Sequence, residues 1–289
     1  MRLISLILLF LLSGTVSAQK VEWYTTTQTS PWVKQKVKPE RVTTGAEIVL
    51  DPTLRLQLIM GIGGCFNEMG WDALNALSAE DREAVLQAIF SKDGACFNYC
   101  RLPMGANDFA LSFYSSADVA GDFNLVNFNI DRDRYILIPY IKAARQINPD
   151  LRIWASPWCP PAWMKTNNHY ASAVRPSGEK DVNGLLPREA ITEFSTGFRM
   201  EEGYLKTYAD YFARFIKAYE AEGLPLECIH VQNEPCSNQV FPSCKWRTED
   251  LTFFLGHYLG PTFERENIKT DIYFGTINTS NPDYVRTAL

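Results

Sequence analysis

Short apolar runs alternate with longer amphipathic stretches from about residue 54 to the end of the chain. The short runs have the length and composition of buried strands, and the longer stretches carry apolar residues at helical spacing. Alternation of strand and helix indicates a parallel sheet with helical crossovers. The expected strands are 56–60, 97–102, 151–155, 228–232 and 271–274, and the expected helices follow Ser78 and cover 131–148, 204–221, 248–264 and 282–289.

Two architectures share this chain order, a doubly wound sheet and a (β/α)8 barrel. Polar and aromatic clusters follow the carboxyl ends of the first four expected strands, and in a barrel those ends meet at one mouth. A dinucleotide-binding sheet would carry a phosphate loop after its first strand, but Gly61-Ile62-Gly63-Gly64 lacks the third glycine at the required spacing. The sequence therefore predicts the α/β class and a TIM barrel, with the first five βα units present.

Three segments are expected along the chain. Residues 1–18 contain a positively charged residue, Arg2, then an apolar run, and they end in small residues. This pattern is typical of a secretory signal peptide. Residues 19–53 form an approach segment, in which 46–50 looks like an orphan strand of a side β-domain. Residues 54–289 form the N-terminal part of the barrel. A complete barrel has eight strands and about 250 residues, so we expect a C-terminally truncated barrel.

The signal peptide predicts export to the periplasm, the cell surface or the medium, without a stable membrane anchor. The formal net charge is −5 and no basic block is present, which argues against nucleic acid as a partner. Aromatic residues make up 13% of the chain, and their rings can stack on the apolar faces of sugars. This richness is compatible with a carbohydrate site, although aromatic residues also fill cores.

No cofactor is expected from the motifs of this chain. Only three histidines occur, the cysteine spacings do not match a zinc site, and neither a P-loop nor a G-x-S-x-G motif is present. The seven cysteines are an odd number, so at least one thiol stays unpaired. A Cys236–Cys244 disulfide and free buried thiols remain equally open.

The strongest candidate for catalysis is Glu234, which follows the fourth expected strand in the stretch His230–Pro235. A glutamate at this end of a barrel strand points into the mouth. Partial burial would suit it to donate a proton to a leaving oxygen and later to take one from water. The preceding Asn233 can bind a substrate hydroxyl.

Other candidates lie after the earlier strands. Trp158 and Trp163 stand in a proline-rich stretch that presents rigid rings for stacking, although either can be a core residue. Asp108 can accept bonds from sugar hydroxyls and Arg101 can orient a carboxylate, or the two can belong to structural ion pairs. Glu68 is a fourth carboxylate for the mouth or a supporting residue near it.

Four stretches together resemble one known family. GIGGCFNE (61–68), FNYCRLPMGANDF (97–109), ASPWCPPAWMKTN (155–167) and VQNEP (231–235) follow one another near the first four strands. They resemble glycoside hydrolase family 30, which includes glucosylceramidase-type β-glucosidases and microbial β-1,6-glucanases. The resemblance implies a (β/α)8 barrel with a side β-domain built from both chain ends, and a retaining enzyme with two glutamates.

By this resemblance, Glu234 is the acid/base and Asn233 is its neighbouring asparagine. The substrate-binding aspartate falls on Asp108, the stacking tryptophan on Trp158 and the mouth arginine on Arg101. The family's nucleophile is a glutamate at the end of strand seven, and no residue of this chain receives that role.

The resemblance thus predicts an exported retaining β-glycosidase without cofactors. Its substrate would be a β-glucoside oligosaccharide, polysaccharide or glycolipid, and the long excursion at 166–201 favours a glucan over ceramide. Two alternatives remain, a non-catalytic carbohydrate-binding protein and an inactive fragment.

Overall fold

The structure is a computed structural model that describes residues 21–38, 45, 51, 53–175 and 183–288. The chain divides into two compact units, Met1–Gln57 and Leu58–Leu289. The expected signal peptide and the expected orphan strand at 46–50 lie outside the described residues.

The first unit contains a short antiparallel hairpin that the sequence analysis did not predict. Its strands are β1 (Trp23–Thr25) and β2 (Val33–Gln35). The ring of Tyr24 stacks on that of Trp32 with 5.3 Å between the centroids. Both strands are only three residues long, and therefore gave little periodicity to detect.

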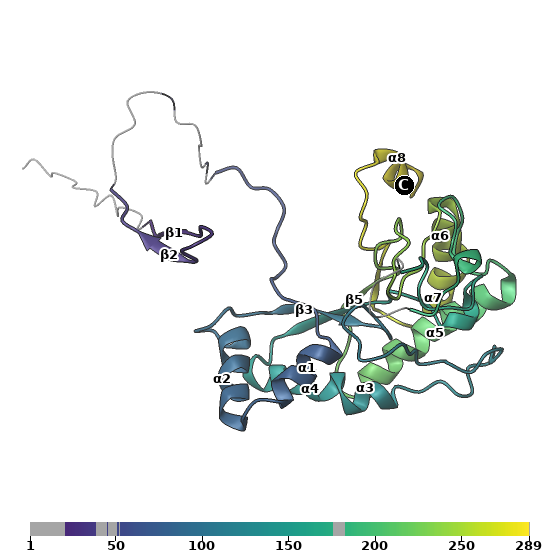
Figure 1. Cartoon of the computed structure of the whole chain (residues 1–289), viewed down its shortest axis with the longest axis horizontal. Helices are drawn as coiled ribbons and strands as arrows, with labels where there is room; N and C mark the ends of the chain where they lie inside the picture. The colour runs from purple at the N-terminus through teal and green to yellow at the C-terminus, as the bar shows by residue number, and fades with distance from the viewer. Residues whose placement is uncertain (1–20, 39–44, 46–50, 52, 176–182, 289) are drawn as a thin grey trace, which may run out of the picture. The chain divides into compact units, whose positions relative to one another are not determined.

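The second unit is built on a parallel sheet of four strands (Figure 1). The strands are β3 (Tyr99–Pro103), β4 (Arg152–Ser156), β5 (Cys228–His230) and β6 (Asp271–Tyr273). They are adjacent in chain order and all parallel. Four of the five expected strands are thus confirmed to within three residues at either end. An order without reversal is that of a barrel wall, whereas a doubly wound sheet reverses at its switch point.

Helices precede, connect and follow the strands of this sheet. They are α1 (Glu68–Asn75), α2 (Ala79–Phe90), α3 (Asp131–Tyr135), α4 (Leu137–Ile147), α5 (Glu202–Ala221), α6 (Thr248–Phe254), α7 (Gly260–Arg265) and α8 (Pro282–Ala288). Short 3-10 turns lie at Ala162–Met164 and Pro187–Glu189. The expected cap Ser78 accepts a hydrogen bond from the Asp81 N–H at 3.0 Å. No described helix is long and apolar enough to cross a membrane.

One face of the sheet packs against the helices and forms the core. Leu102, Ile153, Ala155 and Ile229 point to this face and are at most 1% exposed. Figure 1 shows α1, α2, α3 and α4 on this side of the sheet. Because side chains alternate along a strand, the residues between them face the opposite side, and Arg101 is one of these.

The first expected strand is wrong. Residues 56–60 have no regular structure and are exposed, with Leu58 at 87%. The chain instead reaches the edge of β3 at Ile62–Phe66, where the Tyr99 N–H donates to the Ile62 carbonyl at 3.2 Å and Cys65 forms a parallel bridge to Arg101. A β-carbon on Gly63 would lie 2.2 Å from the Tyr99 carbonyl oxygen, so only glycine fits this close approach.

Two expected helices are interrupted near prolines. The expected helix 131–148 breaks at Ile136, between α3 and α4. Pro139 has no N–H to donate to the carbonyl four residues back, and its ring crowds that turn. The expected helix 248–264 contains a π turn at Leu255–Leu259, just ahead of Pro261.

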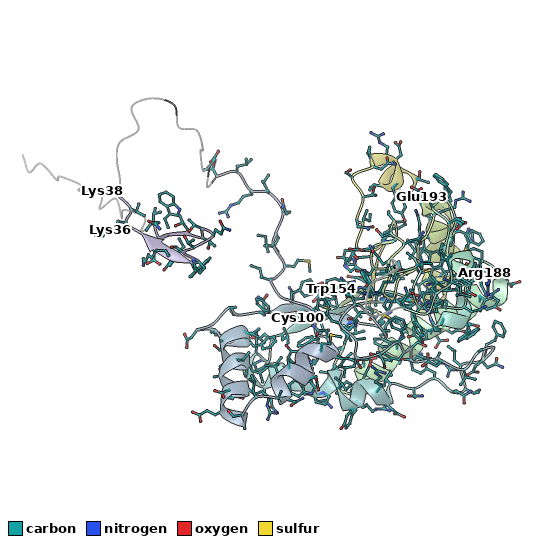
Figure 2. All side chains as sticks on the ribbon, in the orientation of Figure 1. Lys36, Lys38, Cys100, Trp154, Arg188 and Glu193 are labelled. Carbon is teal, nitrogen blue, oxygen red and sulfur yellow. The ribbon has the colours of Figure 1, made fainter. Side chains whose placement is uncertain are left out.

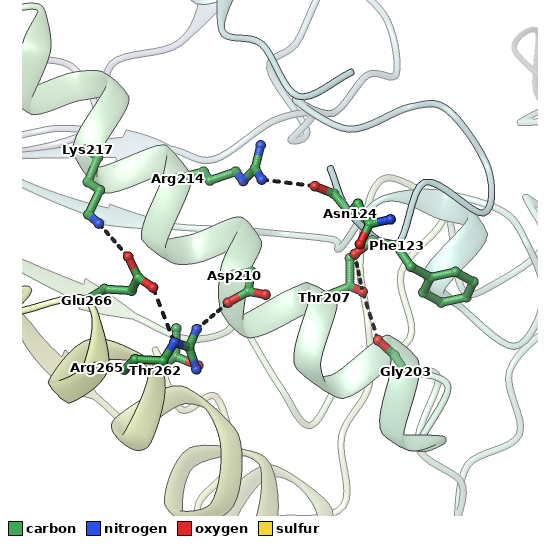
Figure 3. A network of polar contacts seen from close by, with 10 residues as sticks. All are labelled: Phe123, Asn124, Gly203, Thr207, Asp210, Arg214, Lys217, Thr262, Arg265 and Glu266. Carbon is green, nitrogen blue, oxygen red and sulfur yellow. Dashed lines mark hydrogen bonds and ion pairs between the residues drawn. The ribbon is translucent and has the colours of Figure 1, made fainter. Parts of the chain in front are cut away.

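The long helix α5 is tied to its neighbours at its surface (Figure 3). Arg265 of α7 pairs with Asp210 at 2.6 Å, and Lys217 pairs with Glu266 at 2.6 Å. Arg214 donates to the Asn124 carbonyl at 2.9 Å. These charges are partly exposed and each pair stabilises by about 0–1 kcal/mol. The buried face of α5, which includes ten residues, therefore dominates its attachment.

All seven cysteines are free thiols, so the Cys236–Cys244 disulfide is not formed.

Candidate active site

Arg101 links three neighbouring strands at their carboxyl ends. It lies on β3, and its Nη2 donates to Ser156 Oγ at the end of β4 at 3.0 Å. The same nitrogen donates to Asn233 Oδ1, just after β5, at 2.8 Å. The structure therefore brings together two of the predicted site residues, Arg101 and Asn233, which are 132 positions apart.

Asn233 is held from both sides. Its backbone N–H donates to the Pro157 carbonyl at 2.8 Å, and its Oδ1 accepts a second bond from Thr276 Oγ1 at 3.2 Å. The residue also forms a parallel bridge with Thr276, which follows β6. Because the amide oxygen is occupied by two donors, the amide NH2 is the group left to donate to a ligand hydroxyl.

Glu234 has an unusual backbone conformation, with φ at +46°. Its N–H reaches the Thr276 carbonyl at 3.2 Å, which holds the turn. The left-handed region is sparsely used by residues other than glycine and is enriched at functional sites. The half-buried carboxylate accepts a hydrogen bond at Oε2 from Gln239 Nε2 at 3.2 Å. The geometry presents a fixed carboxylate beside the Asn233 amide.

The Arg101 guanidinium lies over the rings of two tryptophans. Its central carbon lies 3.8 Å from the Trp158 ring centroid and 4.9 Å from that of Trp154, which is labelled in Figure 2. Trp158 is 7% exposed, and Arg101 covers one face of its ring. That face is therefore not open to a sugar.

Burial lowers the pKa of Arg101 to about 10. The negative charges of Asp108 and Glu234 act in the opposite direction. Arg101 therefore remains a cation at neutral pH. Asp108 is exposed and close enough to contribute to this field. The cluster thus holds one fixed positive charge among carboxylates.

The structure does not bring Trp163 or Glu68 into this cluster. Trp163 is 8% exposed, donates from Nε1 to the Ala117 carbonyl at 2.8 Å and packs edge-on against Phe123. It is a core residue. Glu68 is fully buried and both its oxygens accept from Arg132, at 2.7 and 2.6 Å. Because this carboxylate is fully buried in its ion pair with Arg132, it is not exposed to a substrate.

Sequence reasoning missed Ser156, Gln239 and Thr276. Ser156 lies inside a stretch that was singled out for its tryptophans. Gln239 lies in the loop five residues after Glu234, and no motif marks it. Thr276 follows the last expected strand, and that position was the signal that could have found it. Among the described residues, no group of three or more His, Cys, Asp or Glu side chains is arranged to hold a metal ion.

Comparison with known proteins identifies relatives of the barrel segment. The family model described as "Glycosyl hydrolase family 30 TIM-barrel domain" matches residues 59–184. A Caenorhabditis elegans protein named "Putative glucosylceramidase 4" is 30% identical over 81% of this chain and 42% of its own length. An endo-1,6-β-D-glucanase of Neurospora crassa is 27% identical over 82% of this chain and 46% of its own length.

A solved structure agrees with this assignment. The crystal structure of SrfJ from Salmonella typhimurium matches with a TM-score of 0.72 and 27% identity, over 88% of this chain and 53% of that chain. The chain thus spans about half the length of the relatives it matches. Together these findings confirm the resemblance to family 30 and the TIM-barrel fold predicted from the sequence.

Proposed function

We propose that this chain, which resembles glycoside hydrolase family 30 over its barrel segment, carries the acid/base half of a β-glycosidase active site. The observation that supports this most is the position of Glu234. It follows a barrel strand, is held in a left-handed turn and lies beside an asparagine fixed by two donors. Barrel active sites lie at this end of the strands.

In the proposed reaction, Glu234 in its acid form donates a proton to the glycosidic oxygen as the bond to the sugar breaks. The resulting carboxylate then takes a proton from the water that releases the sugar. The NH2 of Asn233 binds a hydroxyl of the sugar, and Arg101 fixes the direction of that amide through its bond to Oδ1.

A retaining mechanism needs a second carboxylate about 5–5.5 Å from the first. Glu68 does not supply it, because its carboxylate is engaged by Arg132. Asp108 is exposed and belongs to the group around Arg101. The resemblance to family 30 places the nucleophile at the end of strand seven, so the proposal takes it from outside this chain and not from Asp108.

We propose a β-glucoside as the substrate, with a β-1,6-glucan favoured over a glycolipid. Relatives named glucosylceramidase and endo-1,6-β-D-glucanase support the β-glucoside. The excursion at 166–201 follows a strand at the mouth and would reshape the sites beyond the cleaved bond, which favours the glucan. Export through residues 1–18 is part of the proposal and accords with an extracellular polymer as substrate.

The test uses the full-length protein, which on this proposal includes the part that supplies the nucleophile, and two variants of it; wild type means this protein throughout. Wild type, Glu234→Gln and the control Glu220→Gln, an exposed position on α5, are assayed for hydrolysis and binding of β-1,6-glucan. We expect wild type and the control to hydrolyse it, and Glu234→Gln to bind it with turnover lowered about 10²- to 10⁴-fold. Binding without hydrolysis by wild type would support a carbohydrate-binding protein. If wild type neither binds nor hydrolyses β-1,6-glucan, the proposed substrate is contradicted.

A further inference from the structure

A buried ammonium group fastens two loops beside the candidate site. Lys165 is fully buried, and its Nζ donates to the carbonyls of Tyr170 at 2.9 Å, Ala171 at 3.1 Å and Ser243 at 2.6 Å. It also donates to Ser172 Oγ at 3.2 Å. No carboxylate forms an ion pair with it in the part of the chain that the structure describes.

Burying the Lys165 ammonium costs free energy unless hydrogen-bond acceptors surround it. A buried charge without hydrogen bonds is strongly unfavourable, and here four oxygens replace water. The oxygens come from the segments 170–172 and 243, which are far apart in the sequence. Lys165 therefore acts as a fixed internal cation that joins the excursion after β4 to the loop after β5.

Hydrogen bonds connect Ser243, which Lys165 binds, to Gln239. Ser243 Oγ accepts from the Gln239 N–H at 3.1 Å, and the Ser243 N–H donates to the Tyr170 carbonyl at 3.1 Å. The Gln239 carbonyl in turn accepts from the N–H groups of Ser172 at 3.0 Å and Ala173 at 2.9 Å. The backbone of Gln239 is thus tied to the same two segments that Lys165 holds.

The side chain of Gln239 then reaches Glu234, with Nε2 donating to Oε2 at 3.2 Å. We propose that Gln239 is a positioning residue for Glu234, and that the buried Lys165 ammonium holds the loop that presents Gln239. This inference rests on the proposed function of Glu234 as acid/base, and it assigns a role to two residues outside the Arg101 cluster.

The hydrogen bond distinguishes the two oxygens of the carboxyl group. A neutral carboxyl that accepts an N–H at Oε2 carries its proton on Oε1. The Oε1–H bond therefore breaks as the proton passes to the leaving oxygen, and the electron pair of the sugar–oxygen bond goes to that leaving group. Gln239 thereby fixes which oxygen delivers the proton and the direction of delivery.

The kinetic test separates this role from a purely structural one. We compare kcat/KM of Gln239→Met for two aryl or alkyl β-glucosides, one with a good and one with a poor leaving group. A good leaving group departs without a proton, so its kcat/KM should change less than about threefold. The poor one should lose about 10- to 100-fold, because the lost hydrogen bond stabilises the carboxylate charge that develops as the proton leaves. Equal losses for both substrates, or none, would overturn the proposal.

Matched variants complete the test. Gln87→Met is the control, because Gln87 makes the same type of bond to Glu83 on the exposed surface of α2, and it should behave as wild type. Lys165→Met should show the same dependence on the leaving group as Gln239→Met, with a lower melting temperature. A folded Lys165→Met protein with wild-type kinetics would overturn the role of Lys165. If this variant does not fold, Ser243→Ala, which removes the acceptor of the Gln239 N–H, takes its place with the same expected signature.

A readout without turnover keeps the inference distinct from the proposed function. The side-chain NH2 signals of Gln239, followed by ¹⁵N NMR, should shift in Glu234→Gln, whereas those of Gln87 should not. No shift at Gln239 would overturn the contact. If wild type is inactive on every β-glucoside while the shift occurs, the contact stands and the proposed function falls.

Discussion

Arg101 on β3 and Asn233 after β5 are joined by a 2.8 Å hydrogen bond that spans the end of the intervening strand, β4. The same guanidinium nitrogen also bonds Ser156 on β4. One side chain thus sets the relative position of three strand ends, and with them the residue that precedes Glu234.

Replacing Arg101 by lysine should therefore impair catalysis. An ammonium group lacks the planar fork and the stacking on Trp158 and Trp154. We expect kcat/KM to fall at least about tenfold, the loss of one charge-assisted hydrogen bond. Steady-state kinetics on an aryl β-glucoside measures this. Arg265→Lys, at an exposed ion pair on α7, is the control and should match wild type.

The ion pair between the buried Glu68 and the partly exposed Arg132 should affect stability and not substrate binding. Glu68→Gln leaves the partly exposed Arg132 without its carboxylate, and we expect a loss of about 1.5–3 kcal/mol in the free energy of unfolding. Urea denaturation gives this value, and KM for a β-glucoside should stay as in wild type. A raised KM with unchanged stability would restore Glu68 as a substrate ligand.

Asp133 predicts a pH dependence of stability. It is buried and accepts from Tyr219 at 2.7 Å and Tyr114 at 2.9 Å, and burial raises its pKa to about 6. The folded state thus binds the proton more tightly than the unfolded state, whose aspartate has a pKa of about 3.9. This stabilisation is present below about pH 4 and is lost as the pH rises through about 6.

In wild type the free energy of unfolding should fall by about 3 kcal/mol between pH 4 and pH 7 relative to Asp133→Asn, which has no titrating group there. Urea titrations of both proteins across this range measure the difference. Parallel curves would show that the folded and unfolded states bind the Asp133 proton equally.

Gly63 predicts a steric limit at the edge of β3. A β-carbon there would lie 2.2 Å from the Tyr99 carbonyl oxygen, so Gly63→Ala must displace the edge segment. We expect a lower melting temperature and a loss of about 2 kcal/mol in the free energy of unfolding. Gly256→Ala is the control, since nothing lies within 4 Å of its added carbon. Equal melting temperatures for the two variants would contradict the close packing at Gly63.

The parallel sheet was predictable because periodicity reports burial. The strands around Ile153 and Ile229 are short apolar runs between amphipathic helices, and the structure has them within three residues of the expected bounds. The first strand was misplaced because an exposed apolar run, 56–60, has strand composition, whereas the true edge segment is rich in glycine. Close approach of two backbones is a tertiary property that composition does not report.

The candidate site was predictable where a polar residue comes just after an expected strand, as Asn233 and Glu234 do after 228–232. Gln239 and Ser156 were missed because their importance comes from the partner that the fold supplies. Glu68 and Trp163 show the converse. Their residue types suit a sugar site, but the same carboxylate and indole are satisfied by Arg132 and the Ala117 carbonyl inside the fold.

The central claim is that Glu234 donates the proton to the leaving group, and a leaving-group series tests it most directly. The measurement is kcat/KM for the full-length wild-type protein and its Glu234→Gln variant on aryl β-glucosides whose phenols span a wide range of acidity. We predict a shallow dependence for wild type and a steep one for Glu234→Gln, with the two converging for the most acidic phenol. Parallel dependences for the two proteins would contradict the claim.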